Sequence, residues 1–141
     1  MPDNYDPNNI FARILRGELP CVRICEDEQT LAFMDVMPQV DGHVLVISKE
    51  AAATLFELSP EALAAVMRTT QRVARAVRVA MAAPGVMLAQ LNGSAAGQSV
   101  PHFHFHVIPR HGGEVMRPHA VKPEAPEKLQ ALAARIIAAL D

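Results

Sequence analysis

The sequence has few of the features that mark secreted or membrane-bound proteins. It contains only two cysteines, Cys21 and Cys25. Their spacing is poor for a disulfide or a zinc knuckle, so both are expected to be buried or half-buried free thiols. No apolar run approaches the roughly 20 residues that span a bilayer. Residues 1–9 lack the basic and apolar regions of a signal peptide. These absences predict a cytoplasmic protein with no membrane partner.

The sequence also lacks a strong excess of charge of either sign. Its 13 basic and 15 acidic residues give a net charge of −2, which excludes the broad basic surface of a nucleic-acid-binding protein. A small phosphorylated ligand is still compatible, because local donors can bind it. The 141 residues, half of them apolar, suit one domain with a hydrophobic core. We expect this domain to span 1–141, with a loose N-terminus at 1–8 and a C-terminal extension at 111–141.

The hydrophobic pattern predicts both helices and strands. Helices are expected over residues 10–16 with Asn9 as the N-cap, over residues 59–81 with Ser59 as the N-cap, and from Pro123 onward. Strands are expected over residues 22–26, 30–36, 43–48, 86–91 and 101–109. Strands that cluster with few helices between them predict an α+β fold with a largely antiparallel sheet.

Three histidines in one short segment carry most of the chemical information. Residues two apart on a strand lie on one face, roughly 6.6 Å apart. His102, His104 and His106 are therefore expected to share a face, while Phe103 and Phe105 point into a core. Such a row could bind zinc or copper, act as nucleophile and acid–base catalyst, or be a solvated edge without function.

The loop before the histidines consists of small and amide residues. Gly97 lets the backbone approach a ligand closely, and successive N–H groups can form an anion-binding nest. Asn92, Gln98 and Ser99 add side-chain donors. The same residues are ordinary in hairpin loops. Beside a row of histidines, however, they suit a phosphate better than a bare cation.

The sequence from Asn92 to Arg110 resembles the signature of the histidine-triad (HIT) superfamily, which reads His-x-His-x-His followed by two apolar residues. Four segments of the N-terminal half agree in order and spacing: Ile10-Phe11, Glu18-Leu19-Pro20, residues 31–36 and residues 42–47. The resemblance covers about residues 8–110 and points to a nucleotide-binding hydrolase of the bacterial HIT type. It implies an α+β fold with a roughly five-stranded antiparallel sheet, a long helix and a C-terminal helix. It also implies a two-fold homodimer.

The resemblance further implies covalent chemistry at the α-phosphate of a nucleotide. His104 matches the nucleophile, which would form a nucleotidyl-histidine that water converts to a nucleoside monophosphate. His106 matches a residue that donates a hydrogen bond to phosphate. His102 matches a residue that orients the nucleophile, and His43 matches a partner in the same hydrogen-bond network. The implied substrates are a nucleoside phosphoramidate, a dinucleoside polyphosphate or a nucleotidyl adduct, with adenosine as the expected nucleoside.

The nucleotide-binding residues follow from the same resemblance. Asn92, Gly97, Gln98 and Ser99 match the phosphate-binding loop, and Ser99 would help the leaving group. Asp35 matches the acceptor for the ribose hydroxyls. The residues that match the apolar pocket around the base are Ile10, Phe11, Ile14, Leu19, Phe33 and Val36.

The sequence departs from some HIT proteins in its metal-binding features. Several members carry a zinc site that includes a cysteine pair near the first helix, and this sequence has no such pair. We therefore predict no structural zinc and no metal ligands. No cofactor is required, although Mg²⁺ could accompany polyphosphate substrates. The alternative function is a non-catalytic nucleotide- or metal-binding module that uses the same histidines.

Overall fold

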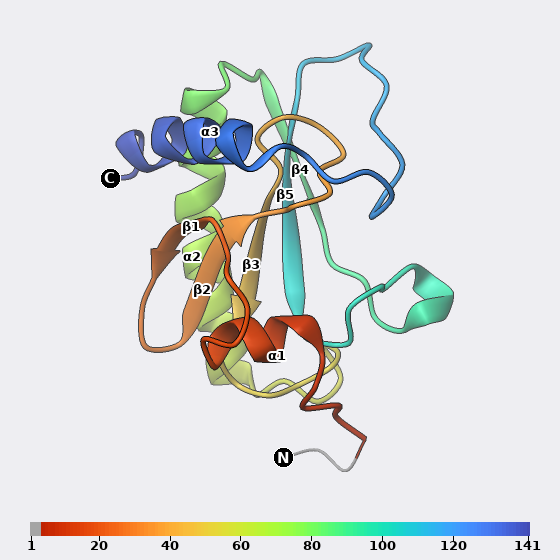
Figure 1. Cartoon of the computed structure of the whole chain (residues 1–141). Coiled ribbons are helices and arrows are strands. Elements are labelled where there is room, and N and C mark those ends of the chain that lie inside the picture. The colour runs from red at the N-terminus through yellow and green to blue at the C-terminus, as the bar shows by residue number, and fades with distance from the viewer. Residues whose placement is uncertain (1–3) are drawn as a thin grey trace.

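The structure is a computed structural model that describes residues 4–141, and these residues form a five-stranded sheet with helices on both faces (Figure 1). The helices and strands are α1 (Ile10–Leu15), β1 (Arg23–Glu26), β2 (Thr30–Met34), β3 (Val44–Ser48), α2 (Pro60–Ala80), β4 (Gly85–Ala89), β5 (His104–Arg110) and α3 (Pro126–Ala138), with one 3-10 turn at Ser94–Ala96. None of the helices in this part of the chain is both long and apolar enough to cross a membrane.

The strands lie in the order β1-β2-β3-β5-β4, and every neighbouring pair is antiparallel. The predicted α+β fold with an antiparallel sheet is therefore confirmed. β3 lies at the centre, and its Leu45 and Ile47 stand opposite His106 and His104 of β5. This register places the histidines in the middle of the sheet, while β1 and β4 form its two edges.

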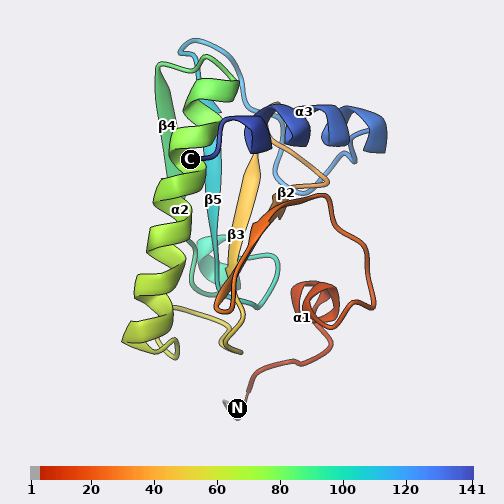
Figure 2. The ribbon, with the colours of Figure 1, turned by 90° about the vertical axis from the view of Figure 1, so that its left-hand side faces the viewer.

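The two faces of the sheet have separate cores. Figure 2 shows α2 on one side of the sheet and α1 on the other. The larger core packs α2 and α3 against the face that carries Phe103 and Val107. The smaller core includes Phe11 of α1 and Leu45 of β3. Because side chains alternate along β5, His104 and His106 point toward the smaller core and α1.

Local hydrogen bonds explain why these helices begin where they do. The Asn9 side chain accepts a hydrogen bond from the Ala12 backbone N–H, and the Ser59 hydroxyl accepts one from Ala62. Both are N-cap interactions, as the sequence predicts. The C-terminal helix begins at Pro126 and not near Pro123.

The strand boundaries differ from those predicted, and the differences at β2 and β5 affect the site. β2 ends at Met34, because the Asp35 carboxylate accepts a hydrogen bond from the Met37 N–H at 2.8 Å and turns the chain. β5 begins at His104, so the prediction that His102 lies on the same strand is wrong. The N–H of Phe103 instead donates to the carbonyl of Ala52 in a neighbouring loop.

Tyr5 and the segment between β5 and α3 both approach the histidines on the face of the sheet that carries the smaller core. The prediction of a loose segment over 1–8 is wrong for Tyr5, which is only 8% exposed; residues 1–3 lie outside the described residues. Downstream of β5, the Arg117 N–H donates to the Gln39 carbonyl, and the Glu124 N–H donates to Val36. We call residues 114–125 the C-terminal strap. These contacts hold the strap against the end of the sheet.

Candidate active site

Four histidines are buried beside α1. His43, His102, His104 and His106 are all at most 5% exposed. Burial lowers the pKa of His104 to about 4 and the pKa values of His43 and His106 to about 3. Burial also lowers the pKa of His102. All four imidazoles are therefore neutral near pH 7, and each has one nitrogen with a proton and one with a lone pair.

The tautomer of His104 follows from its hydrogen bond to the backbone. Its Nδ1 lies 2.6 Å from the carbonyl oxygen of His102. A carbonyl can only accept, so Nδ1 carries the proton and Nε2 keeps its lone pair. Phe11 packs edge-to-face against this ring, with centroids 5.0 Å apart. The arrangement fixes an unprotonated nitrogen on the cavity side of the imidazole.

The tautomer of His106 is set by a relay through His43. The Gln39 backbone N–H donates to Nδ1 of His43, so the proton of His43 is on Nε2. That Nε2 lies 2.9 Å from Nδ1 of His106 and donates to it. His106 therefore carries its own proton on Nε2. His43 Nε2 also lies 3.4 Å from a carboxylate oxygen of Asp35, but this contact is not an ion pair because His43 is neutral.

A third chain of hydrogen bonds holds His102. Its Nε2 donates to the Ser48 carbonyl at 2.6 Å, so its Nδ1 accepts from the Tyr5 hydroxyl. The Asn9 amide in turn donates to the Tyr5 oxygen at 3.0 Å. His102 thus contributes its backbone carbonyl to His104, while its side chain is fixed behind the cavity.

A cavity of about 110 Å³ opens beside these histidines. It is lined by Ile10, Phe11, Ile14, Pro20, Cys21, Phe33, Asp35, Val36, Met37, Leu45, Ser99, Val100, His104, His106, His119 and Ala120. Small-molecule sites usually measure roughly 300–1,000 Å³. The strap forms one wall of this cavity through His119 and Ala120.

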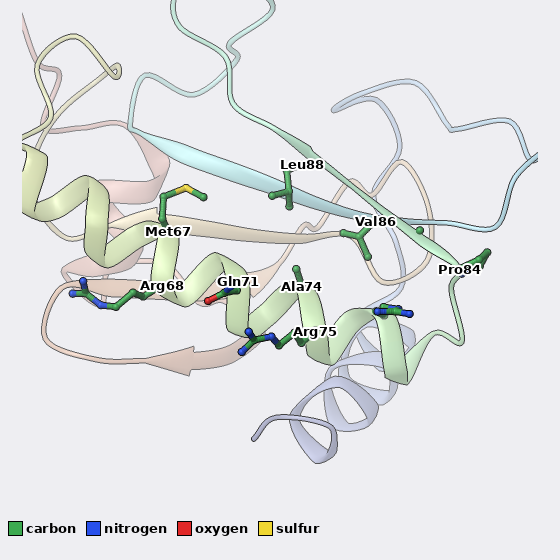
Figure 3. A pocket seen from close by; sticks show the side chains of 10 residues that line it. Met67, Arg68, Gln71, Ala74, Arg75, Pro84, Val86 and Leu88 are labelled. Carbon is green, nitrogen blue, oxygen red and sulfur yellow. The ribbon is translucent and has the colours of Figure 1, made fainter.

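A larger cavity of about 770 Å³ lies between α2 and β4 (Figure 3). Its lining includes Met67, Leu88 and three arginines but no histidine, cysteine or carboxylate. It offers apolar surface and positive charge but no nucleophile or proton acceptor. The smaller cavity is therefore the better candidate for chemistry, despite its size.

The structure brings most of the predicted site residues together. Nine of them line the cavity: Ile10, Phe11, Ile14, Phe33, Asp35, Val36, Ser99, His104 and His106. Burial raises the pKa of the Asp35 carboxyl. His43 and His102 lie behind the cavity wall. Four further predicted residues do not line it either, and these are Leu19, Asn92, Gly97 and Gln98.

The loop residues that do not line the cavity are engaged in hydrogen bonds inside the protein. The Gln98 side chain accepts from the Gly93 N–H and donates to the carbonyls of Ala53 and Val100. Asn92 accepts from the Leu55 N–H. The backbone N–H groups of residues 96–98 also bond within the loop, so these amides do not form an anion-binding nest in this arrangement.

Sequence reasoning missed two polar residues of the site. Tyr5 is the only tyrosine in the chain and lies five residues before α1, in a segment whose polarity suggested a loose terminus. His119 comes from the strap, and its Nε2 lies 3.2 Å from the Ser99 hydroxyl. No periodic pattern surrounds His119, so only the fold reveals its position.

Asp35, His43 and His106 form a group whose possible ligand atoms lie within 4.8 Å of one another. Nε2 of His43 already donates a hydrogen bond to Nδ1 of His106 across 2.9 Å. A zinc ion would need both nitrogens unprotonated, at about 2.0–2.1 Å from the metal. A zinc ion in this group would therefore have to replace the hydrogen bond between His43 and His106.

The chain belongs to the HIT family, because residues 16–113 match the HIT domain. Among its relatives is adenosine 5'-monophosphoramidase hnt1 of Schizosaccharomyces pombe, which is 38% identical over 131 residues, covering 90% of this chain and 94% of the relative.

Solved structures agree with this family. The structure of a Hit-like protein involved in cell-cycle regulation from Bartonella henselae, with an unknown ligand, superposes with a TM-score of 0.90 at 43% identity, covering 96% of this chain and 99% of that one. A zinc-bound histidine triad family protein from Mycobacterium smegmatis gives a TM-score of 0.81 at 34% identity, with coverages of 94% and 92%.

Proposed function

We propose that this protein is a hydrolase that cleaves nucleotides at the α-phosphate through a covalent intermediate on His104. The observation that carries this proposal is the pair of tautomers fixed by the hydrogen-bond network. His104 has a lone pair on Nε2, and the neighbouring His106 has a proton on Nε2. Their rings lie 5.0 Å apart, so a nucleophile and a hydrogen-bond donor line one small cavity.

The proposed reaction proceeds in two displacements at phosphorus. In the first, His104 Nε2 forms a bond to the α-phosphorus as the bond to the leaving group breaks. His106 Nε2–H donates a hydrogen bond to a non-bridging phosphate oxygen, where negative charge accumulates. In the second, water attacks phosphorus and the bond to His104 breaks, which releases a nucleoside monophosphate. His43 keeps His106 in the donating tautomer throughout.

The apolar end of the cavity supports a nucleoside as the bound group. Ile10, Phe11 and Phe33 offer a surface against which a base can pack. Asp35 lies at the same cavity and can accept hydrogen bonds from ribose hydroxyls. The name of the fission-yeast relative supports adenosine as the nucleoside and a phosphoramidate as the substrate. Mg²⁺ could accompany polyphosphate substrates.

The decisive experiment uses adenosine 5'-phosphoramidate with the wild-type protein and a His104→Ala variant. Hydrolysis should vanish in the variant, while the affinity for AMP stays within about tenfold, or roughly 1.4 kcal/mol. An acid-labile adenylyl adduct on His104 should be detectable by mass spectrometry in the wild type. The matched control is His111→Ala, since His111 is an exposed histidine outside the cavity that contacts the Met81 carbonyl. Hydrolysis that survives His104→Ala would exclude the covalent mechanism.

The same samples test the alternative of a non-catalytic or metal-binding module. Metal analysis of the wild-type protein should find no stoichiometric zinc if the His43–His106 hydrogen bond persists in solution. Stoichiometric zinc that is lost on replacing His102, His104 and His106, together with no hydrolysis, would favour the alternative.

We also propose that the protein forms a two-fold dimer through α2 and β4. β4 is an edge strand with one side free of sheet partners among residues 4–141. Leu88 on this strand is 43% exposed, and Met67 of α2 is 38% exposed. A second copy would cover both.

Light scattering should report a dimer for the wild type and a monomer for Leu88→Asp. The control is Val115→Asp, which changes another exposed apolar residue and should leave the dimer intact. A monomeric wild type would refute the dimer.

A further inference from the structure

The leaving group needs a proton that the buried histidines do not provide. If an amine leaves phosphorus without a proton, it leaves as a strongly basic anion. His106 carries a proton on Nε2, but it is a neutral imidazole, and losing this proton would turn it into an imidazolate. His106 can therefore donate a hydrogen bond to phosphate, yet it is a poor acid for an amine.

His119 occupies the position from which a proton could be supplied. It is partly exposed, and it lines the same cavity as His104 and His106. Its ring lies 5.2 Å from that of His106. Its Nε2 lies 3.2 Å from the Ser99 hydroxyl oxygen. A serine hydroxyl can accept one proton while it donates another, so Ser99 can connect His119 to a group bound in the cavity.

We propose that His119 acts through Ser99 to protonate the leaving group. This inference rests on the function proposed above. As His104 Nε2 bonds to phosphorus, the electron pair of the breaking P–N or P–O bond takes the proton of the Ser99 hydroxyl. The His119 imidazolium returns a proton to the Ser99 oxygen and becomes neutral. When water later attacks the intermediate, its proton passes back through Ser99 to His119, and the site is restored.

Contacts to the segment between β2 and β3 hold the strap in place, and His119 with it. Arg117 donates from its backbone to the Gln39 carbonyl at 2.7 Å and from its side chain to Asp41 at 2.8 Å. Glu124 donates to the Val36 carbonyl at 2.9 Å. His119 therefore depends on the strap for its position, and replacing its side chain should leave the buried network around His104 unchanged.

The test compares two substrates that differ in their need for a proton. Ammonia must be protonated to leave adenosine 5'-phosphoramidate, whereas p-nitrophenolate leaves its adenosine 5'-phosphate ester without an acid. His119→Gln keeps a hydrogen-bonding group at this position but cannot carry the proton. We expect kcat for the phosphoramidate to fall about 100-fold and kcat for the nitrophenyl ester to fall less than threefold. KM should be nearly unchanged for both.

Further variants make the result specific. Ser99→Ala should show the same selective loss, and the double variant should be no slower than the slower single variant, because both residues serve one proton transfer. His119→Asn should reproduce His119→Gln, while His111→Gln on the same C-terminal segment should react like the wild type.

Equal losses for the two substrates, or no loss for either, would overturn the role of His119. If the wild type forms no adenylyl adduct on His104, the proposed function fails and this inference falls with it. If the adduct forms but the variants show no preference between leaving groups, only the role of His119 fails.

Discussion

The hydroxyl oxygen of Tyr5 lies 2.6 Å from Nδ1 of His102, although 97 positions separate the two residues in the chain. This contact ties the N-terminal segment to the carbonyl that orients His104. The hydroxyl is the donor, because His102 Nε2 already donates to the Ser48 carbonyl.

Removing this hydroxyl should affect both stability and catalysis. Tyr5→Phe leaves Nδ1 of His102 buried without a donor, which should cost about 1–3 kcal/mol of unfolding free energy. We expect kcat to fall by about three- to tenfold, because His102 also positions His104. Urea unfolding and steady-state kinetics measure the two effects. Asn9→Asp is the control that keeps the cap of α1 while removing the donor to Tyr5. A Tyr5→Phe variant as stable and active as the wild type would refute the coupling.

Gly42 lies at a close approach that excludes a side chain. Its φ is +91°, and a Cβ there would lie 2.8 Å from Cγ of Met81 and 3.2 Å from Cγ of Pro109. Gly42→Ala should therefore lower the unfolding free energy by about 2–3 kcal/mol, through backbone strain and overpacking.

Gly17 provides the comparison for this effect. It also has a positive φ, of +78°, but a Cβ there would meet nothing within 4 Å. Gly17→Ala should cost only the backbone strain of about 1 kcal/mol. Equal losses for the two variants would show that the contact with Met81 relaxes at no cost.

The buried histidines should make the protein less stable in mild acid. The pKa values of His43, His104 and His106 are lowered to between about 3 and about 4 in the folded state, whereas an unfolded histidine titrates near pH 6.5. Between these values the unfolded chain binds more protons than the folded one. Stability is therefore complete above about pH 6.5 and falls as the pH decreases, by about 1.4 kcal/mol per pH unit for each such histidine.

Unfolding measured between pH 7.5 and pH 4.5 tests this dependence. The raised pKa of Asp35 acts in the opposite direction at the acid end, because protonation favours the folded state there. His111→Gln should keep the wild-type slope, since His111 is exposed and lies outside the cluster. A flat profile between pH 7 and pH 5 would show that these imidazoles take up protons as readily in the folded protein as in the unfolded chain.

Sequence patterns were informative where a local rule decides the structure. Alternation along β5 correctly separated Phe105 and Val107 from His104 and His106, because the period of a strand is fixed by its geometry. The caps at Asn9 and Ser59 were predicted because each bond spans only three residues. The end of β2 was misplaced, since Asp35 uses its side chain to turn the backbone and apolar Val36 gives no sign of this turn.

The parts of the site that depend on distant segments were not predictable. His119 reaches Ser99 only because the strap pairs with Gln39 and Val36, and these contacts join segments more than 70 residues apart. Gln98 has the composition expected of a phosphate-binding loop. Its side-chain amide, however, donates to the carbonyl of Ala53. The sequence pattern does not show that Ala53 lies beside this loop.

Gln98 allows a direct test of whether the loop binds phosphate through this side chain. In the structure its amide joins three backbone groups, those of Gly93, Ala53 and Val100. Gln98→Ala should leave these groups unpaired, lower the unfolding free energy by about 1–3 kcal/mol and speed hydrogen exchange at the Gly93 amide. Activity should fall because Ser99 follows directly in the chain. Gln98→Glu keeps the acceptor for Gly93 but loses both donors, so its Gly93 amide should stay protected.

Affinities for adenosine and AMP separate this structural role from direct contact with phosphate. If Gln98 only holds the loop, Gln98→Ala should lower the affinities for adenosine and AMP by similar factors, because the shape of the whole cavity changes. A donor to phosphate would instead weaken the binding of AMP much more than the binding of adenosine. That second pattern would mean that the loop rearranges on binding, and that the bonds from Gln98 to Ala53 and Val100 break when a nucleotide enters the cavity.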